Sequence, residues 1–158
     1  MSDFERDVVQ CLNRFFEEHR IRGFAYRLKQ HKFSTQLVDV LVDSLDPRYY
    51  LAIECKSIKG KKLYFTQHFH NNRDNVHQID FITTFLGRTG RRGYLAIEFR
   101  FGSGRTREAY LVPWSRLLAL YRSTQGIGLE DARGAIPLGR SGEAYVLGEL
   151  EDSTGDTG

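Results

Sequence analysis

The sequence lacks the features that mark secreted, membrane-spanning or low-complexity proteins. Two cysteines and three prolines occur in 158 residues, and so few thiols cannot build a disulfide scaffold. Cys11 and Cys55 also lack the spacing of a metal site. No uninterrupted run of about 18 apolar residues occurs, and the N-terminus lacks the apolar segment of a signal peptide. We therefore expect a cytoplasmic protein, not bound to a membrane, with reduced cysteines.

Apolar and aromatic side chains, by contrast, are plentiful. Hydrophobic residues make up 41% of the chain, which includes 11 Phe, 8 Tyr and 1 Trp. Disordered chains lack the bulky apolar groups that offset the entropy lost on ordering, and this length suits a single core. We expect one domain over residues 1–150, followed by an acidic tail over 151–158.

Basic charge dominates once the end of the chain is set aside. The last ten residues hold four of the 20 acids and no base, so sixteen acids face 23 Lys and Arg in the rest. The basic residues gather in two groups, one over residues 56–73 and one over 88–92. Such groups suit a polyanion such as nucleic acid, although charge alone equally fits a solvated surface.

The hydrophobic periodicity predicts an α/β domain around a mixed sheet. Helical spacing predicts helices over 3–20, 74–86 and 113–121. Extended, β-branched segments predict strands over 24–29, 36–43, 49–57, 94–101 and 108–112. Residues 57–72 are polar and basic, and residues 124–148 are weakly patterned, so neither stretch predicts a defined element.

Charged residues interrupt the second and third predicted strands, which are otherwise apolar. Asp39 lies in the second, and Glu54 and Lys56 lie in the third. Because side chains alternate along a strand, Glu54 and Lys56 point to one face and Cys55 points to the other. If the two strands pair as a hairpin, Asp39 and Glu54 meet on one face beside Lys56.

Two carboxylates in an apolar setting repel each other and lose hydration, and a divalent cation offsets both effects. Oxygen ligands suit Mg²⁺, with Mn²⁺ as a substitute. The metal polarises a phosphate and acidifies a bound water, while Lys56 orients that water or neutralises developing charge. The pattern therefore favours phosphodiester hydrolysis. The alternative is that Glu54 and Lys56 form a solvent-facing pair, and that Asp39 caps a turn or pairs with an arginine.

Asp39 with Glu54-Cys55-Lys56, after a helix carrying Glu5 and before one carrying Gln78, resembles the PD-(D/E)xK nuclease superfamily. Within it, the chain looks most like the Holliday junction resolvases of the archaeal Hjc type and the bacterial RecU type. The resemblance spans residues 4 to about 112 and departs from the motif before Asp39, where valine replaces proline. It implies a restriction-endonuclease-like fold, a mixed central β-sheet flanked by helices with an α-β-β-β-α-β core.

The resemblance also implies roles for individual residues. The implied metal ligands are Glu5, Asp39, Glu54 and the backbone carbonyl of Cys55. The implied catalytic residues are Glu5, Asp39, Glu54, Lys56 and Gln78. Two alternatives stay open: Glu5 forms a capping box with Ser2, and Gln78 is an ordinary boundary residue of its helix.

The segment that follows the third strand is where the superfamily meets the DNA backbone. The residues that we expect to contact DNA are Lys59, Lys61, Lys62, Tyr64, Arg73, Arg88, Arg91 and Arg92. Phe65 is expected in the core. The histidines at 68, 70 and 77 have no nearby cysteine and are not expected to bind zinc, and no glycine-rich motif implies a nucleotide cofactor.

The resulting hypothesis is a Mg²⁺-dependent endonuclease that resolves four-way DNA junctions in recombination and repair. Because a junction has two-fold symmetry and needs paired incisions, the resemblance and the symmetry together predict a homodimer. Two alternatives remain: a related nuclease for other branched or linear DNA, and a DNA-binding module of the same fold without catalysis.

Overall fold

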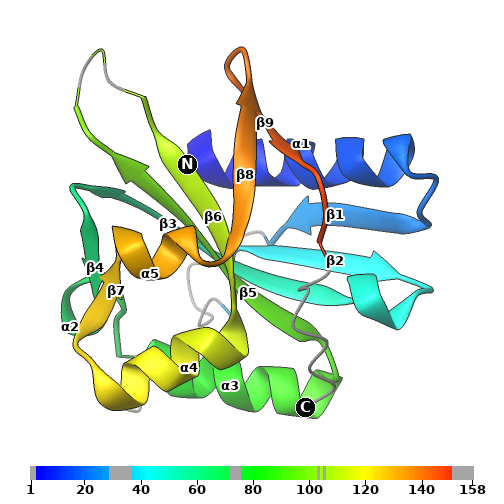
Figure 1. The fold of residues 1–158 in the computed structure, drawn as a ribbon. Helices are drawn as coiled ribbons and strands as arrows, with labels where there is room; N and C mark the ends of the chain where they lie inside the picture. The colour runs from blue at the N-terminus through cyan, green and yellow to red at the C-terminus, as the bar shows by residue number, and fades with distance from the viewer. Residues whose placement is uncertain (1–2, 29–36, 72–75, 103, 105, 151–158) are drawn as a thin grey trace.

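The structure is a computed structural model that describes residues 3–28, 37–71, 76–102, 104 and 106–150. Its centre is a seven-stranded mixed sheet, in the order β1-β2-β3-β5-β6-β8-β9, with α1 on one face and α3 and α4 on the other (Figure 1). The helices are α1 (Asp3–Glu18), α2 (Phe65–His68), α3 (Gln78–Thr89), α4 (Trp114–Ser123) and α5 (Leu129–Arg133), with a 3-10 helix, η1 (Pro47–Tyr49). The strands are β1 (Gly23–Arg27), β2 (Val40–Ser44), β3 (Leu51–Lys59), β4 (Lys62–Tyr64), β5 (Arg92–Arg100), β6 (Glu108–Pro113), β7 (Gly126–Gly128), β8 (Ile136–Ser141) and β9 (Ala144–Leu147).

The helix α1 covers one face of the sheet through the apolar stripe that the sequence predicts. Its buried side chains are Phe4, Val8, Cys11, Leu12, Phe15 and Phe16. They pack in one core with alternate residues of β3 and β5, including Ile53, Cys55 and Ala96. The opposite residues of the same strands, such as Leu95 and Ile97, form the second core with α3 and α4.

The strands β3 and β5 run parallel at the centre of the sheet, and both of their faces are covered. Strands in that position are usually near-continuous apolar runs. Glu54 in β3 and Glu98 in β5 break this pattern, and each is only 2% exposed. With Asp39, they are the buried charged residues in the described part of the chain.

Several element boundaries differ from the predictions. The strand β2 begins at Val40, so Asp39 directly precedes it. The backbone carbonyl of Asp39 accepts a hydrogen bond from the Leu28 N–H. The helix predicted over 74–86 begins at Gln78, because the His77 side chain caps its first turn, and it continues to Thr89. Residues 74 and 75 lie outside the described residues.

Two stretches without a predicted element are structured. Residues 57–72 include β4 and α2, and residues 124–148 include β7, α5, β8 and β9. The strand β4 pairs with β7, about 60 residues later in the chain, in a separate two-stranded sheet. A Cβ atom on Gly126 of β7 would lie 2.1 Å from the Leu63 carbonyl oxygen, so this close pairing needs glycine.

Within the described residues, no helix has both the length and the apolar character needed to cross a membrane.

Candidate active site

The antiparallel pairing of β2 with β3 brings Asp39 and Glu54 together. Val40 lies opposite Ile53, so the preceding Asp39 lies next to Glu54, on the face covered by α3 and α4. The Oδ2 atom of Asp39 accepts the Cys55 backbone N–H at 2.8 Å. The structure therefore confirms the predicted hairpin and the convergence of its two acids.

Glu54 is the most deeply buried acid of this cluster, at 2% exposed against 9% for Asp39. Its Oε2 atom accepts a hydrogen bond from the Gln78 side-chain amide at the start of α3, so Gln78 contacts the acid pair, and its catalytic role stays a prediction. Burial raises the pKa of Glu54 well above its ordinary value, and a hydrogen bond and repulsion from Asp39 add to the rise, while Lys56 opposes it. Two neighbouring carboxylates repel each other, so this pair favours binding of a proton or a cation.

Glu5 reaches the same cluster from the first turns of α1. Burial and the Asp39 charge raise its pKa, and Arg27 opposes that rise. The Arg27 Nη2 atom lies 2.6 Å from Glu5 Oε2. In the described part of the chain, no three His, Cys, Asp or Glu side chains stand together as a complete metal-ligand set. In this arrangement, therefore, Glu5 interacts with the acid pair but is held by Arg27. Ser2, its alternative capping partner, lies outside the described residues.

Lys56 is half-buried and follows Glu54 on the same face of β3. Its Nζ atom lies 4.8 Å from the centre of the Phe69 ring, within the range of a cation–π contact. The Cys55 side chain points the other way, into the α1 core, and burial raises the pKa of its thiol well above the ordinary value. Cys55 is therefore a small buried hydrophobe, as its place in the strand predicts.

The donor set at this site fits a hard divalent cation. Asp39 and Glu54 supply two buried carboxylates, Glu5 a third at the edge, and the Cys55 backbone a carbonyl oxygen. Oxygen ligands of this kind are those that Mg²⁺ and Mn²⁺ use in proteins. A cation would also offset the repulsion between the two carboxylates of the acid pair.

The basic residues expected to contact DNA lie at two ends of the sheet. The first group, Lys59, Lys61, Lys62 and Tyr64, is exposed at the carboxyl end of β3 and in β4. Lys62 Nζ lies 5.3 Å from the centre of the Tyr64 ring, and Phe65 is buried as predicted. Arg73 lies outside the described residues.

The second group, Arg88, Arg91 and Arg92, surrounds the start of β5. This is the opposite end of the parallel β3–β5 pair, roughly 25 Å away at 3.3 Å per residue. Arg88 and Arg92 are exposed, whereas the Arg91 side chain is 9% exposed and ion-paired with Asp43 at 2.9 Å. Its Nη1 atom also donates to the carbonyls of Val42 and Leu51. Arg91 thus joins strands within the protein, and its contact with DNA stays a prediction.

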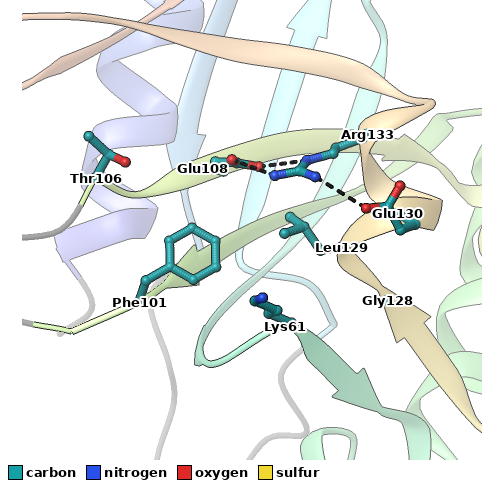
Figure 2. A pocket seen from close by; sticks show the side chains of 8 residues that line it. All are labelled: Lys61, Phe101, Thr106, Glu108, Gly128, Leu129, Glu130 and Arg133. Carbon is teal, nitrogen blue, oxygen red and sulfur yellow. Dashed lines mark hydrogen bonds and ion pairs between the residues drawn. The ribbon is translucent and has the colours of Figure 1, made fainter.

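A cavity of about 710 Å³ opens beside Lys61, two residues beyond the end of β3 (Figure 2). Its lining residues are Lys61, Phe101, Thr106, Glu108, Gly128, Leu129, Glu130 and Arg133. Arg133 is paired there with Glu108 and Glu130. Because none of the predicted site acids lines it, the cavity is not the candidate active site.

Sequence reasoning missed Arg27, Phe69 and the capping role of His77. The sequence does not signal the cap at His77, because Ser, Thr, Asp and Asn are the usual residues at that position. Phe69 lies in a stretch without periodicity, and its contact with Lys56 depends on tertiary structure.

A comparison with solved structures identifies the class of fold as that of a Holliday junction resolvase. One matched structure is that of Hjc, a Holliday junction resolvase from the archaeal hyperthermophile Archaeoglobus fulgidus, determined at 1.6 Å resolution. It aligns with a TM-score of 0.56 and 21% identity, covering 85% of this chain and 91% of that one. No family model and no curated protein matches the sequence. The likeness confirms the predicted α/β fold, a mixed central sheet flanked by helices.

Proposed function

We propose that the protein is a divalent-metal-dependent DNA endonuclease that resolves four-way junctions. The observation that carries this proposal is the buried Asp39–Glu54 pair, with Lys56 beside it, in a fold shared with a Holliday junction resolvase. A buried acid pair costs stability unless it is neutralised, so its retention at the centre of the sheet supports a chemical role.

The residues of the site have different proposed roles in phosphodiester hydrolysis. Asp39, Glu54 and the Cys55 carbonyl would hold Mg²⁺ or Mn²⁺, with Glu5 as a further ligand once it separates from Arg27. When bound, the cation supplies Lewis acidity toward the phosphate and makes a bound water more acidic.

Two other residues support these ligands. Lys56 orients the attacking water or neutralises charge that develops on the phosphate oxygens. Gln78 fixes the orientation of the Glu54 carboxylate through its amide, as an outer-shell hydrogen bond commonly does for a metal ligand.

The proposed substrate is branched DNA, and the proposed assembly is a homodimer. The named function of Hjc supports the first point. The two-fold symmetry of a junction supports the second, because paired cuts need two active sites. Exposed Lys59, Lys61 and Lys62 neutralise phosphates, so each lysine removed should lower the salt dependence of binding by roughly 0.9 in log–log slope.

Cleavage of a labelled four-way junction in Mg²⁺ tests the proposal. We expect Glu54→Gln and Lys56→Ala each to slow cleavage by about 100-fold or more, the usual loss when a charge-stabilising group is removed. Glu98→Gln is the matched control, since Glu98 is equally buried on the other face, and it should cleave like the wild type. Undiminished cutting by either site variant would remove the assigned site.

The same assay separates the alternative functions. Faster cutting of nicked or linear DNA than of the junction would assign a related nuclease of different substrate preference. Junction binding that is unaffected by divalent ions, without cleavage, would assign a non-catalytic binding module.

A further inference from the structure

The Phe69 ring lies against the ammonium group of the proposed catalytic lysine. Lys56 Nζ is 4.8 Å from the ring centre, and Phe69 itself is 2% exposed. A lysine side chain has a flexible four-carbon stem, so its ammonium group can occupy many positions. A buried ring under its end therefore restricts where the ammonium can lie.

The segment that carries Phe69 is fastened to the segment that carries Gln78. Asn71 forms a β-bridge with His77, and the Gln78 backbone N–H donates to the His70 carbonyl at 2.9 Å. The same two short segments thus place a ring on Lys56 and an amide on Glu54. The positions of the amine and the central carboxylate are coupled through this connection.

His77 anchors this arrangement with both ring nitrogens. Its Nδ1 atom accepts the Ile79 N–H at 3.2 Å, which caps α3, and its Nε2 atom lies 3.2 Å from the Phe65 carbonyl oxygen. The His77 ring stacks on Tyr121 of α4, with 5.3 Å between ring centres, and lies 6.1 Å from the Phe69 ring. The four rings of Phe65, Phe69, His77 and Tyr121 therefore form one rigid support.

We infer that Phe69 is a positioning residue, whose ring face holds the Lys56 ammonium next to the acid pair and is itself fixed by His77. The catalytic consequence of this inference rests on the proposed nuclease function. The contact between the Phe69 ring and the Lys56 ammonium is independent of that function.

Fluorination of the ring tests the inference without changing the packing. Site-specific replacement of Phe69 by phenylalanines with one, two and three fluorines weakens the negative ring face in steps at nearly constant shape. We expect the single-turnover cleavage rate of a four-way junction to fall stepwise, by about 3- to 30-fold in total, the range of a cation–π contact. Junction affinity measured in Ca²⁺ should not change.

Phe65 supplies the matched control, because it is equally buried and contacts Phe69 at 6.3 Å between ring centres. Fluorination at Phe65 should leave the cleavage rate unchanged, and fluorination at Phe69 should have no further effect in Lys56→Ala. A flat series at Phe69, or equal losses at both positions, would show that the ring only packs.

A second measurement distinguishes failure of this inference from failure of the proposed function. A proton over a ring face is shifted upfield in NMR, so the Lys56 ε-methylene signal should be shifted and should return to its usual position in Phe69→Leu. If the wild type cuts no DNA, the nuclease proposal fails while this shift still decides the contact. An unshifted signal in an active enzyme would overturn the inference alone.

Discussion

Glu54 and Glu98 are equally buried acids in neighbouring strands, yet their surroundings differ. Glu98 faces the α1 core, where its two oxygens accept the hydroxyls of Ser57 and Tyr145, each at 2.6 Å. Arg107 lies 3.8 Å away. Glu54 faces the other core, where its neighbours are the Gln78 amide, Lys56 and a second acid, Asp39. One acid has a donor on each oxygen, whereas the other lies against a second carboxylate, whose charge Lys56 only partly offsets.

The difference shows that burial and a local motif do not by themselves mark a functional acid. The spacing of glutamate, any residue and a base occurs in both central strands, as Glu54-Cys55-Lys56 in β3 and as Glu98-Phe99-Arg100 in β5. A buried carboxylate with donors on both oxygens is a structural element. A carboxylate placed against another carboxylate retains unused capacity to bind a positive ligand.

The largest effect expected on stability comes from removing the charge at Glu54. Since its pKa is raised in the folded state, the folded protein binds a proton more tightly than the unfolded chain does. Without divalent ions, stability should therefore fall as the pH rises from the ordinary value of 4.5 through the raised pKa. Glu54→Gln should flatten this decline, as measured by urea unfolding across pH in EDTA.

The same unfolding measurements, repeated with Mg²⁺ in place of EDTA, test whether the acid pair binds a cation. A cation that binds only the folded state raises stability by mass action, and it competes with the proton at the acid pair. Mg²⁺ should therefore stabilise the wild type more at higher pH and leave Glu54→Gln nearly unaffected. An equal Mg²⁺ effect on both proteins would place the binding elsewhere and would break the contrast between the two acids.

Removing a donor from Glu98 should have a smaller and purely structural effect. Tyr145→Phe deletes one of its two hydroxyl partners and leaves a buried carboxylate oxygen unsatisfied, at a cost of about 1–3 kcal/mol in the free energy of unfolding. We expect this loss in urea melts, with the junction cleavage rate unchanged at a temperature where the variant is folded. A loss of cleavage by a fully folded Tyr145→Phe would mean that the α1 face also contributes to the chemistry.

The same two acids show how far the sequence predicts this molecule. Asp39 and Glu54 could be placed together because strand alternation and a hairpin are local rules, and the α1 stripe follows from helical spacing alone. Tyr145 could not be assigned to Glu98, because they meet through the short strands β8 and β9. Pro137 and Gly139 weaken the strand signal of β8. Likewise Arg27, the partner of Glu5, gave no signal, because an ion pair between residues 22 apart depends on tertiary packing.

The smallest expected effect comes from Cys55, which lies between the proposed ligand and the proposed catalytic lysine but points to the Glu98 face. Cys55→Ala removes one buried sulfur and should cost about 1 kcal/mol of stability. Its backbone carbonyl is retained, so cleavage should stay within about twofold of the wild type, in contrast to Lys56→Ala one residue later.

Burial raises the thiol pKa values of both cysteines, that of Cys11 to about 12. Mass spectrometry should therefore show alkylation by iodoacetamide at pH 8 only as the protein unfolds. Rapid labelling of Cys55 in the folded protein, or a large loss of cleavage in Cys55→Ala, would show that this side chain is accessible from the site and that the two faces of β3 are not separate.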